Sequence, residues 1–358
     1  MLAAMITAPG ATELEVRDDV EAIGFGPGTV RVAIRATSLC HSDLSGMNGT
    51  IPSPMPLVLG HEGAGEVLEV GEGVTHVRPG DRVIVNWRPS CGECAWCVRG
   101  QGQLCQSGNA AMMTPAFRSG GQDFFRFMGA GTFAQEVVLN AAFASPVPDG
   151  VSYDAAALIG CGVTTGVGAV FNTADVRPGE TVAVIGCGGV GISAILGAKA
   201  AGASHVVAVD PVAARRDWAL SFGATAAVAP EALTDAVAEA TGGLGFDHVV
   251  EAVGRPATFR SAYDATRRGG NVVLVGVGGA KDEFPVSMLE LSTAEKRVLP
   301  SFYGGDTVTR TYARIAELVR TGRLDLERLI THRLPLTGIN EALGLMRSGE
   351  ALRIALTV

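Results

Sequence analysis

The stretch "TVAVIGCGGVGISAILGAKAAGASHVVAVD", residues 181–210, indicates how the middle of the chain folds. It begins with a continuous apolar strand pattern (181–186), passes into a helical pattern rich in small residues (188–203), and ends in a second apolar strand pattern (205–210). An apolar strand, a helix and another apolar strand in this order predict a parallel β-sheet covered by helices.

The turn after the first of these strands carries "GCGGVG" (186–191), which matches the glycine pattern of dinucleotide-binding folds. The pattern predicts that Gly186 allows a tight turn, Gly188 lets the backbone approach a pyrophosphate, and Gly191 lets the helix pack closely. The helix N-terminus at Gly189 and Val190 then offers N–H groups and a positive dipole end to the phosphates. A glycine-rich turn without a ligand is the alternative interpretation.

The second strand ends in Asp210, which we expect to accept hydrogen bonds from the adenosine ribose hydroxyls. A carboxylate at this position repels the extra phosphate of NADP, so the sequence favours NAD. Arg215 and Arg216 follow closely and offer a place for that phosphate if NADP is the cofactor instead.

Strand and helix patterns continue on both sides of this unit. Residues 1–160 contain short β-branched runs separated by Gly and Pro, which predicts a barrel-like, partly antiparallel fold. The runs in the first part are 29–40, 65–71 and 81–87, and the later patterns are a helix at 214–224 and strands at 246–254 and 269–279. The fold class is therefore α/β, with a β-rich part and a doubly wound parallel sheet.

Composition excludes several classes of function. The 358-residue chain is 47% hydrophobic and 18% charged, with a net charge of −8, which argues against nucleic acid as a partner. We find no signal peptide and no apolar stretch of the roughly 18–20 residues that would span a membrane. Seven cysteines, an odd number, favour reduced thiols or metal ligands in the cytoplasm over a disulfide framework.

Four cysteines lie in "CGECAWCVRGQGQLC", residues 91–105. Four thiolates complete a tetrahedral zinc shell and leave no position for substrate, so this zinc is predicted to be structural. An iron–sulfur cluster and four free thiols are the alternatives. The predicted ligands are Cys91, Cys94, Cys97 and Cys105.

The other three cysteines are Cys40, Cys161 and Cys187, and Cys187 lies inside the glycine pattern as a small filler. Cys40 and Cys161 together with His61 would form a three-ligand zinc site with an open fourth position, which is the arrangement of a catalytic zinc. Sequence separations alone do not show that these residues meet, and each one is also explained by simple burial.

Taken together, these motifs resemble the zinc-dependent medium-chain alcohol dehydrogenases, in the dimeric class with a structural zinc loop. The motifs are C-H-S-D (40–43), G-H-E (60–62), the four-cysteine loop, the glycine pattern and the tail 329–353. The resemblance implies a GroES-like catalytic domain of residues 1–162 and 303–358 and a Rossmann NAD-binding domain of residues 163–302. The implied reaction is reversible hydride transfer between a primary alcohol or aldehyde and NAD, with two zinc ions per chain.

The resemblance also implies roles for single residues. It makes Cys40, His61 and Cys161 the catalytic zinc ligands and Ser42 the hydroxyl that takes up the substrate proton. Asp43 orients the zinc-bound histidine, and Glu62 stands behind the zinc. The implied cofactor contacts are His41 and Arg353 at the pyrophosphate, Thr165 near the nicotinamide, Arg215 near the ribose, and Val275 and Val277.

The implied substrate pocket consists of bulky apolar side chains, which predicts a primary alcohol with an aromatic or extended apolar chain. Its residues are Ile51, Trp87, Leu104, Phe127, Met128 and Phe302, with Val277 close by. Many relatives carry a histidine in place of Ser45, at the outer end of the proton relay. Relatives that oxidise the glutathione adduct of formaldehyde carry an acid and an arginine where this chain has Ile51 and Asn109. A dehydrogenase for another thiol adduct, such as that of mycothiol, is the alternative.

The insertion at 108–131 resembles that of the dimeric members, so we predict a homodimer with a small-molecule substrate and no nucleic-acid or membrane partner. A non-catalytic, zinc-stabilised NAD-binding protein is an alternative of another class. The open-site ligand set and Ser42 argue against it, because a pure binding protein needs neither.

Overall fold

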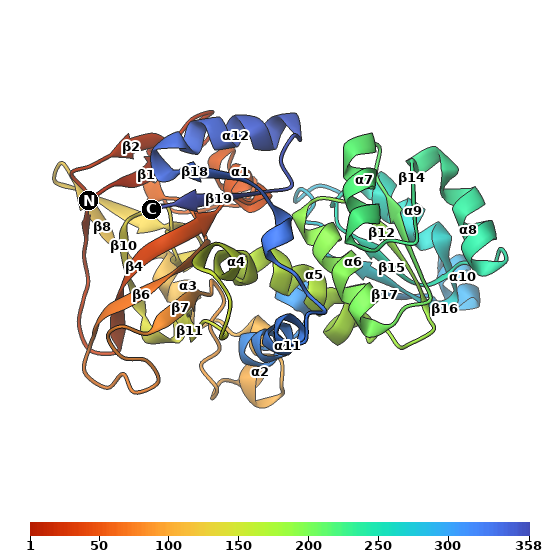
Figure 1. The fold of residues 1–358 in the computed structure, drawn as a ribbon, viewed down its shortest axis with the longest axis horizontal. Coiled ribbons are helices and arrows are strands. Elements are labelled where there is room, and N and C mark those ends of the chain that lie inside the picture. The colour runs from red at the N-terminus through yellow and green to blue at the C-terminus, as the bar shows by residue number, and fades with distance from the viewer. The chain divides into compact units, whose positions relative to one another are not determined.

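The computed structural model describes residues 1–358, which form two compact units. Unit 1 comprises Met1–Cys161 and Thr307–Val358, and unit 2 comprises Gly162–Asp306. Both ends of the chain lie in unit 1 (Figure 1). The sequence prediction had divided the chain after residues 162 and 302.

Unit 2 is built on a sheet of six strands that are all parallel, and it confirms the predicted Rossmann-type sheet. The strand order is β14 (Ala226–Val228), β13 (His205–Val209), β12 (Thr181–Ile185), β15 (Phe246–Glu251), β16 (Thr266–Leu274) and β17 (Arg297–Pro300). The helices that pack on it are α6 (Gly189–Ala201), α7 (Ala213–Phe222), α8 (Leu233–Thr241), α9 (Pro256–Ala265) and α10 (Met288–Ala294), as Figure 1 shows.

Burial explains the apolar strands of unit 2. The central strand β12 pairs with β13 along one edge and with β15 along the other, and its consecutive residues 182–185 are all buried, so both its faces are covered as well. Val182, Val184 and the core residues Phe246 and Tyr263 are fully buried. A strand with two covered faces carries a continuous apolar run, which is the pattern seen in residues 181–185.

Unit 1 contains two mostly antiparallel sheets, as predicted for a GroES-like domain. The first has the order β2 (Glu15–Arg17), β1 (Ala3–Ile6), β5 (Leu57–Val58), β9 (Gln122–Arg126), β8 (Phe117–Ser119) and β3 (Glu21–Ala22). The second has the order β11 (Ala144–Pro146), β7 (Arg82–Val85), β6 (Glu62–Val70), β4 (Thr29–Ser38), β19 (Arg353–Thr357) and β18 (Ile330–Pro335), with β10 (Glu136–Asn140) paired to β4.

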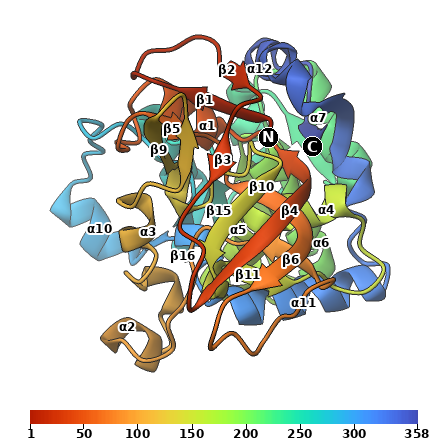
Figure 2. The ribbon, with the colours of Figure 1, turned by 90° about the vertical axis from the view of Figure 1, so that its left-hand side faces the viewer.

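The long strand β4 organises unit 1, because β6, β10 and β19 all pair with it. Figure 2 shows β4 and β6 side by side. The pairing of β19 with β4 joins the tail of the chain to its first part, with Ala355 opposite Ser38. In the same way Glu62, the first residue of β6, lies opposite Ser38, the last residue of β4.

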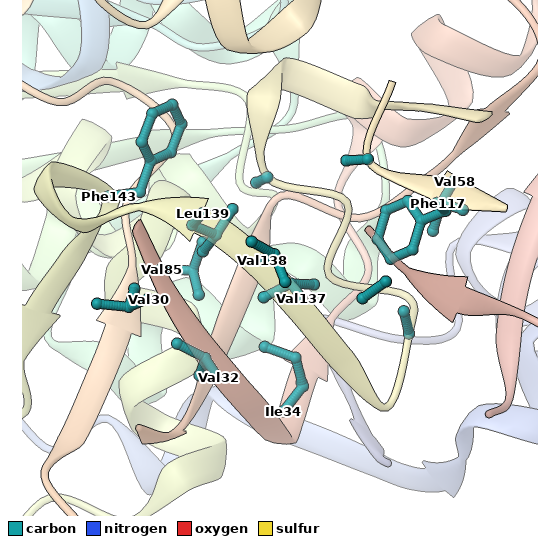
Figure 3. Packing of buried hydrophobic residues seen from close by; sticks show 14 of the residues in the cluster. Val30, Val32, Ile34, Val58, Val85, Phe117, Val137, Val138, Leu139 and Phe143 are labelled. Atoms are coloured by element: carbon teal, nitrogen blue, oxygen red, sulfur yellow. The ribbon is translucent and has the colours of Figure 1, made fainter. Parts of the chain in front are cut away.

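The core of unit 1 lies between β4, β10 and the strands next to them. Val30, Val32 and Ile34 of β4 pack with Val137 and neighbouring residues of β10 (Figure 3). The helices of unit 1 are short: α1 (His41–Met47), α2 (Ala95–Val98), α3 (Asn109–Met112), α4 (Tyr153–Leu158), α11 (Val308–Arg320) and α12 (Ile339–Ser348).

One helical run differs from the sequence prediction. Residues Tyr153–Ala174 form a continuous helix whose most apolar 18-residue window has a mean hydropathy of 1.5, which is long and apolar enough to span a membrane by composition. The sequence does not predict this run as a membrane span, because glycines and threonines interrupt its apolar residues. Of its most apolar window, 83% is buried inside the protein, so this run packs as a core helix.

Candidate functional site

The turn between β12 and α6 has the geometry that the glycine pattern predicts. Gly186 has a φ of +93°, in the left-handed region that favours glycine. A Cβ atom at Gly191 would lie 1.8 Å from the carbonyl oxygen of Gly186, so no other residue fits there. The turn and the helix therefore pack closely only because both positions are glycine.

Gly188 differs from these two glycines, because a Cβ atom there would meet no atom within 4 Å. It is the N-cap of α6, so the first N–H groups of the helix, including those of Gly189 and Val190, lie next to this open space. Open space at a glycine beside a helix N-terminus fits the pyrophosphate of a dinucleotide.

Asp210 follows β13 directly and its side chain is 2% exposed. Its Oδ2 accepts a hydrogen bond from the Cys187 N–H at 2.9 Å, and its Oδ1 accepts one from the Val212 N–H at 2.9 Å. These bonds fix the carboxylate at the glycine turn and leave lone pairs for ribose hydroxyls. Cys187 itself is buried, and burial raises the pKa of its thiol to about 12, so it is a filler with no reactive thiolate.

The two arginines after Asp210 are already engaged. Arg215 Nη1 lies 3.9 Å from Asp210 Oδ2, and Arg216 Nη1 donates to the carbonyl oxygens of Asp210 and Pro211 at 2.7 and 3.0 Å. A 2′-phosphate at this position would have to displace these contacts and would meet the Asp210 carboxylate. The local electrostatics therefore favour NAD.

The four cysteines of residues 91–105 come together around α2, with their sulfur atoms all within 4.8 Å of one another. Cys91 and Cys97 have sulfur atoms 3.9 Å apart, and Cys94 and Cys105 have sulfur atoms 3.8 Å apart. Four thiols at this spacing fit one tetrahedral metal ion that is closed to other ligands.

Hydrogen bonds to sulfur support this interpretation. Burial raises the pKa of the Cys105 thiol, but hydrogen bonds from Ser107 and from the Cys91 backbone outweigh burial and lower it to about 6. The Ser107 hydroxyl lies 3.0 Å from the Cys105 sulfur, and the Cys91 N–H lies 3.4 Å from it. The loop thus stabilises the thiolate of Cys105, the form that binds zinc, whereas burial raises the pKa of the Cys97 thiol to about 12.

A second cluster forms in unit 1 from residues far apart in the sequence. The ligand atoms of Cys40, His61, Glu62 and Cys161 all lie within 4.8 Å of one another, and all four residues are buried. Because Ser38 of β4 lies opposite Glu62 of β6, the residues just beyond these strand ends, Cys40 and His61, must be neighbours. Cys161 joins them from the π-helical turn Ile159–Val163.

Asp43 orients the histidine of this cluster. Its Oδ1 lies 3.1 Å from His61 Nδ1, and both side chains are fully buried. The Nδ1 atom therefore carries the proton, and Nε2 presents its lone pair to the two thiols. Nε2 is a buried nitrogen without any hydrogen-bond partner, which is expected of an atom that ligates a metal. The residues present fit a zinc ion with one open position.

Glu62 and Arg353 form a buried ion pair behind this cluster. Arg353 also donates a hydrogen bond to the Ser38 hydroxyl at 2.9 Å, which fixes the guanidinium at the junction of β4, β6 and β19. Burial raises the pKa of Glu62 to about 8 even though Arg353 opposes this shift. Ser38 is a positioning residue that sequence analysis missed, and a serine at the end of a strand gave no signal of it.

Helix α1 carries the other predicted catalytic groups of unit 1. Ser42, in its first turn, is half-buried, with its hydroxyl oxygen 3.9 Å from the Cys40 sulfur. Ser45 lies one turn further on the same face and is also half-buried, whereas His41 is exposed at the start of the helix.

The predicted pocket residues differ in their exposure. Ile51, Trp87, Leu104 and Met128 of unit 1 are half-buried. Phe127 is fully buried, and its ring meets the His61 ring edge-to-face at a centroid distance of 5.6 Å, so in this structure it supports the metal ligand instead of lining an open surface. The remaining predicted residues lie in unit 2: Phe302 and Val277 are exposed, and Thr165 and Val275 are half-buried.

Two family models match most of the chain. Residues 26–149 match the alcohol dehydrogenase GroES-like domain, and residues 189–320 match the zinc-binding dehydrogenase family. The first match includes Cys40, His61 and the four-cysteine loop, and the second begins within the glycine pattern.

Named relatives cover nearly the whole chain. An S-(hydroxymethyl)glutathione dehydrogenase of Synechocystis is 37% identical over 91% of this chain and 91% of its own length. The crystal structure of a benzyl alcohol dehydrogenase from Acinetobacter calcoaceticus has a TM-score of 0.92 at 27% identity and covers 100% of this chain and 99% of its own. An alcohol dehydrogenase zinc-binding domain protein from Burkholderia ambifaria has a TM-score of 0.93 at 32% identity, covering 100% and 98%.

Mutations in the four-cysteine cluster and in the Cys40–His61–Cys161 cluster are predicted to have different effects on stability and activity. Cys94→Ala removes one ligand of the closed site and should lower the free energy of unfolding by more than about 4 kcal/mol, the range typical for loss of a metal site. Cys40→Ala should lower stability less than Cys94→Ala does but lower kcat/KM about a thousandfold, because a Lewis acid supplies several kcal/mol. Zinc analysis, thermal unfolding and alcohol-dependent NADH formation measure these effects. A fully folded Cys94→Ala protein without activity would mean that the two sites are assigned the wrong way round.

The position of Asp210 predicts the choice of cofactor. Asp210→Ala should lower kcat/KM for NAD roughly ten- to hundredfold, because hydrogen bonds from the ribose to a charged acceptor are lost. It should raise kcat/KM for NADP, because a negative charge is removed next to Arg215. Asp217→Ala, at an exposed position of α7, is the matched control and should change neither value. A wild-type preference for NADP would contradict this prediction.

Proposed function

Because this chain belongs to the zinc-dependent medium-chain alcohol dehydrogenase family, we propose that it oxidises a primary alcohol with an aromatic or extended apolar chain. It is an NAD-dependent oxidoreductase with two zinc sites per chain, one closed and one open. The proposal rests above all on the open cluster of Cys40, His61 and Cys161, which has a catalytic ligand set with a buried carboxylate behind its histidine.

The side chains predicted around the substrate support the apolar class. Ile51, Trp87, Leu104 and Met128 are large and carry no charge, and each remains partly accessible. Apolar surface of this kind stabilises an apolar alcohol in proportion to the area removed from water, at about 0.8 kcal/mol per buried methylene group. The similarity of the fold to the benzyl alcohol dehydrogenase of Acinetobacter calcoaceticus is consistent with this class.

The residues of unit 1 divide the chemical work between them. A zinc ion held by Cys40, His61 and Cys161 would act as a Lewis acid that makes the alcohol proton easier to remove. NAD is the hydride acceptor. Asp43 keeps the His61 ring in one orientation and one tautomer, so that Nε2 always faces the site.

Ser42 is the group proposed to receive the alcohol proton. Its hydroxyl both donates and accepts hydrogen bonds, so it can take up a proton on one side while it releases another on the other side. Ser45 lies one turn along the same helix face and lacks the imidazole that many relatives have there. The outer step of the relay therefore runs through hydroxyl groups and water in this proposal.

A second candidate substrate is the hydroxymethyl adduct of a thiol other than glutathione. The name of the Synechocystis relative, an S-(hydroxymethyl)glutathione dehydrogenase, favours the adduct class. Glutathione itself fits less well, because Ile51 is apolar and Asn109 is neutral where a glutathione adduct meets charged groups. The Asn109 side chain instead accepts a hydrogen bond from Arg88 at 2.9 Å.

We also propose that the chain forms a homodimer through unit 2. Strand β17 pairs with β16 alone, so one of its edges is open. Several apolar side chains near this edge are exposed: Met288 by 84%, Leu289 by 74%, Leu291 by 45% and Val298 by 38%. An open strand edge with exposed apolar side chains is a typical interface between identical subunits.

A cytoplasmic location is part of the proposal. All seven cysteines are free thiols in this structure, and six of them belong to the two clusters that fit zinc. Thiol ligands stay reduced in the cytoplasm, where disulfides are rare.

The substrate class predicts an order of catalytic efficiencies. Benzyl alcohol and geraniol should exceed ethanol in kcat/KM by about a hundredfold or more, because each carries several more apolar carbons into the pocket. Trp87→Ala should reduce this difference, whereas Trp218→Ala, a half-buried tryptophan of unit 2, should not. Steady-state kinetics with these alcohols and with a hydroxymethyl thiol adduct distinguish the candidates. Ethanol at the head of the series would exclude an apolar substrate, and a dominant thiol adduct would favour the second candidate.

The proposed dimer interface can be tested by introducing a charged side chain into it. Leu289→Glu should convert the dimer into a monomer, because two carboxylates would be buried against an apolar surface. Leu244→Glu is the matched control, since Leu244 is 78% exposed elsewhere in unit 2. Light scattering coupled to gel filtration gives the masses. A monomeric wild-type chain, or a dimer that Leu289→Glu leaves intact, would refute this interface.

A further inference from the structure

We propose that unit 1 contains an anion-binding site separate from the Cys40–His61–Cys161 cluster, in which Arg126 binds a small oxyanion. Arg126 ends strand β9 and lines a cavity of about 420 Å³. The walls of this cavity are largely apolar and include Leu139, Phe143 and Ala111. Three of the residues at its wall, Val138, Leu139 and Phe143, appear in Figure 3.

Arg126 is a buried cation with one recorded hydrogen bond and one buried donor that has no partner. The residue is only 8% exposed. Its Nη1 donates a hydrogen bond to the Val138 carbonyl oxygen, and its Nε is buried without any hydrogen-bond partner. A guanidinium has five N–H donors, and leaving such donors unpaired in a protein interior is costly. The protein therefore leaves at least one N–H group of this guanidinium without an acceptor.

No carboxylate balances the charge of Arg126. It takes part in no ion pair, and none of the cavity-lining residues is an aspartate or a glutamate. Burial alone accounts for the lowered pKa of Arg126, to about 10, so the guanidinium is still protonated at neutral pH. Arg126 thus has no carboxylate partner, and the only potentially anionic side chain at the cavity wall is Cys91 of the four-cysteine cluster.

The proposed anion site lies on the other side of strand β9 from the Cys40–His61–Cys161 cluster. Neighbouring residues at the end of β9 point to opposite sides, and the ring of Phe127 faces His61. Arg126 therefore points away from the metal ligands and toward β10. None of Cys40, His61 and Cys161 lines the cavity, whereas Cys91 of the four-cysteine cluster lies at its wall.

The chemistry of the site selects the ligand class. A planar guanidinium binds carboxylates and phosphate-type oxyanions through paired N–H donors, and the low polarity around it strengthens this attraction. The volume has room for a small anion with a short apolar tail along the wall formed by Leu139 and Phe143. The shared chemistry is an oxyanion, and its source is either an inorganic phosphate or a small carboxylate.

The alternative explanation is that Arg126 only covers the open edge of β10. Strand β10 pairs with β4 alone, so the Val138 carbonyl needs a donor, and Arg126 supplies one. That role uses one of the five N–H groups and leaves the charge uncompensated. Water alone would then fill the cavity, and the protein would not respond to particular anions.

The test uses the zinc-loaded full chain with saturating NAD, which keeps phosphate out of the nucleotide site. Inorganic phosphate and butyrate are compared with chloride at equal ionic strength, by titration calorimetry and thermal unfolding. Phosphate, butyrate or both should bind and raise the unfolding temperature. The anion that binds with the lower dissociation constant shows whether the natural ligand is a phosphate or a small carboxylate. Arg126→Met should raise the dissociation constant at least tenfold. Arg118→Met is the matched control, an exposed arginine on the adjacent strand β8, and it should bind like the wild type.

The proposal would be overturned if the anions bound the wild type and Arg126→Met with equal dissociation constants. It would also be overturned if neither anion bound the wild type or raised its unfolding temperature. Arg126→Met could fail to fold, so a second measurement uses the wild type alone. Crystals soaked in selenate should show anomalous density within hydrogen-bond distance of the Arg126 guanidinium. Selenate bound only to exposed arginines would refute the site.

Discussion

The buried carboxylate of Asp43 is the group on which the metal cluster depends. It accepts hydrogen bonds from the Cys40 N–H at 3.0 Å and from the Gly60 N–H at 3.2 Å, and it lies 3.1 Å from His61 Nδ1. One fully buried side chain thus ties together the end of β4, the start of β6 and the histidine ring. A buried carboxylate is costly without such partners, so the three contacts and the carboxylate stabilise one another.

The sequence predicted the two sites whose residues are adjacent in the chain. The turn with Gly186 and Gly191, and the loop with Cys91 and Cys105, are both built from local geometry. A close approach of 1.8 Å between a Cβ at Gly191 and the Gly186 oxygen follows from the turn itself, so the glycine pattern alone reports it. The same locality explains why the strands of the parallel sheet could be predicted from their apolar runs.

The open metal cluster could not be predicted from local sequence, because its residues are brought together only by the register in which distant strands pair. Ser38 stands opposite both Glu62 and Ala355, and this one position brings together Cys40, His61 and Arg353. A sequence pattern predicts that strands exist but not which residues are paired, and a shift of one residue would reverse every side chain. The resemblance to a family, and not the spacing, therefore supplied this ligand set. The buried pairing of Arg353 with Glu62 likewise had no local signal.

Arg126 shows the limit of sequence patterns most clearly. In "FFRFMG" (124–129) a single arginine lies between Phe125 and Phe127, and a charged residue flanked by apolar ones in a strand usually faces solvent. The structure buries the face that carries Arg126 because β10, five residues long, lies across it and offers the Val138 carbonyl at its open edge. The burial of this cation is therefore set by where a distant strand ends, and the absence of a matching carboxylate follows from the apolar residues of that strand. A binding site of the kind proposed here would therefore have no motif in the sequence, because the burial of its arginine depends on a distant strand.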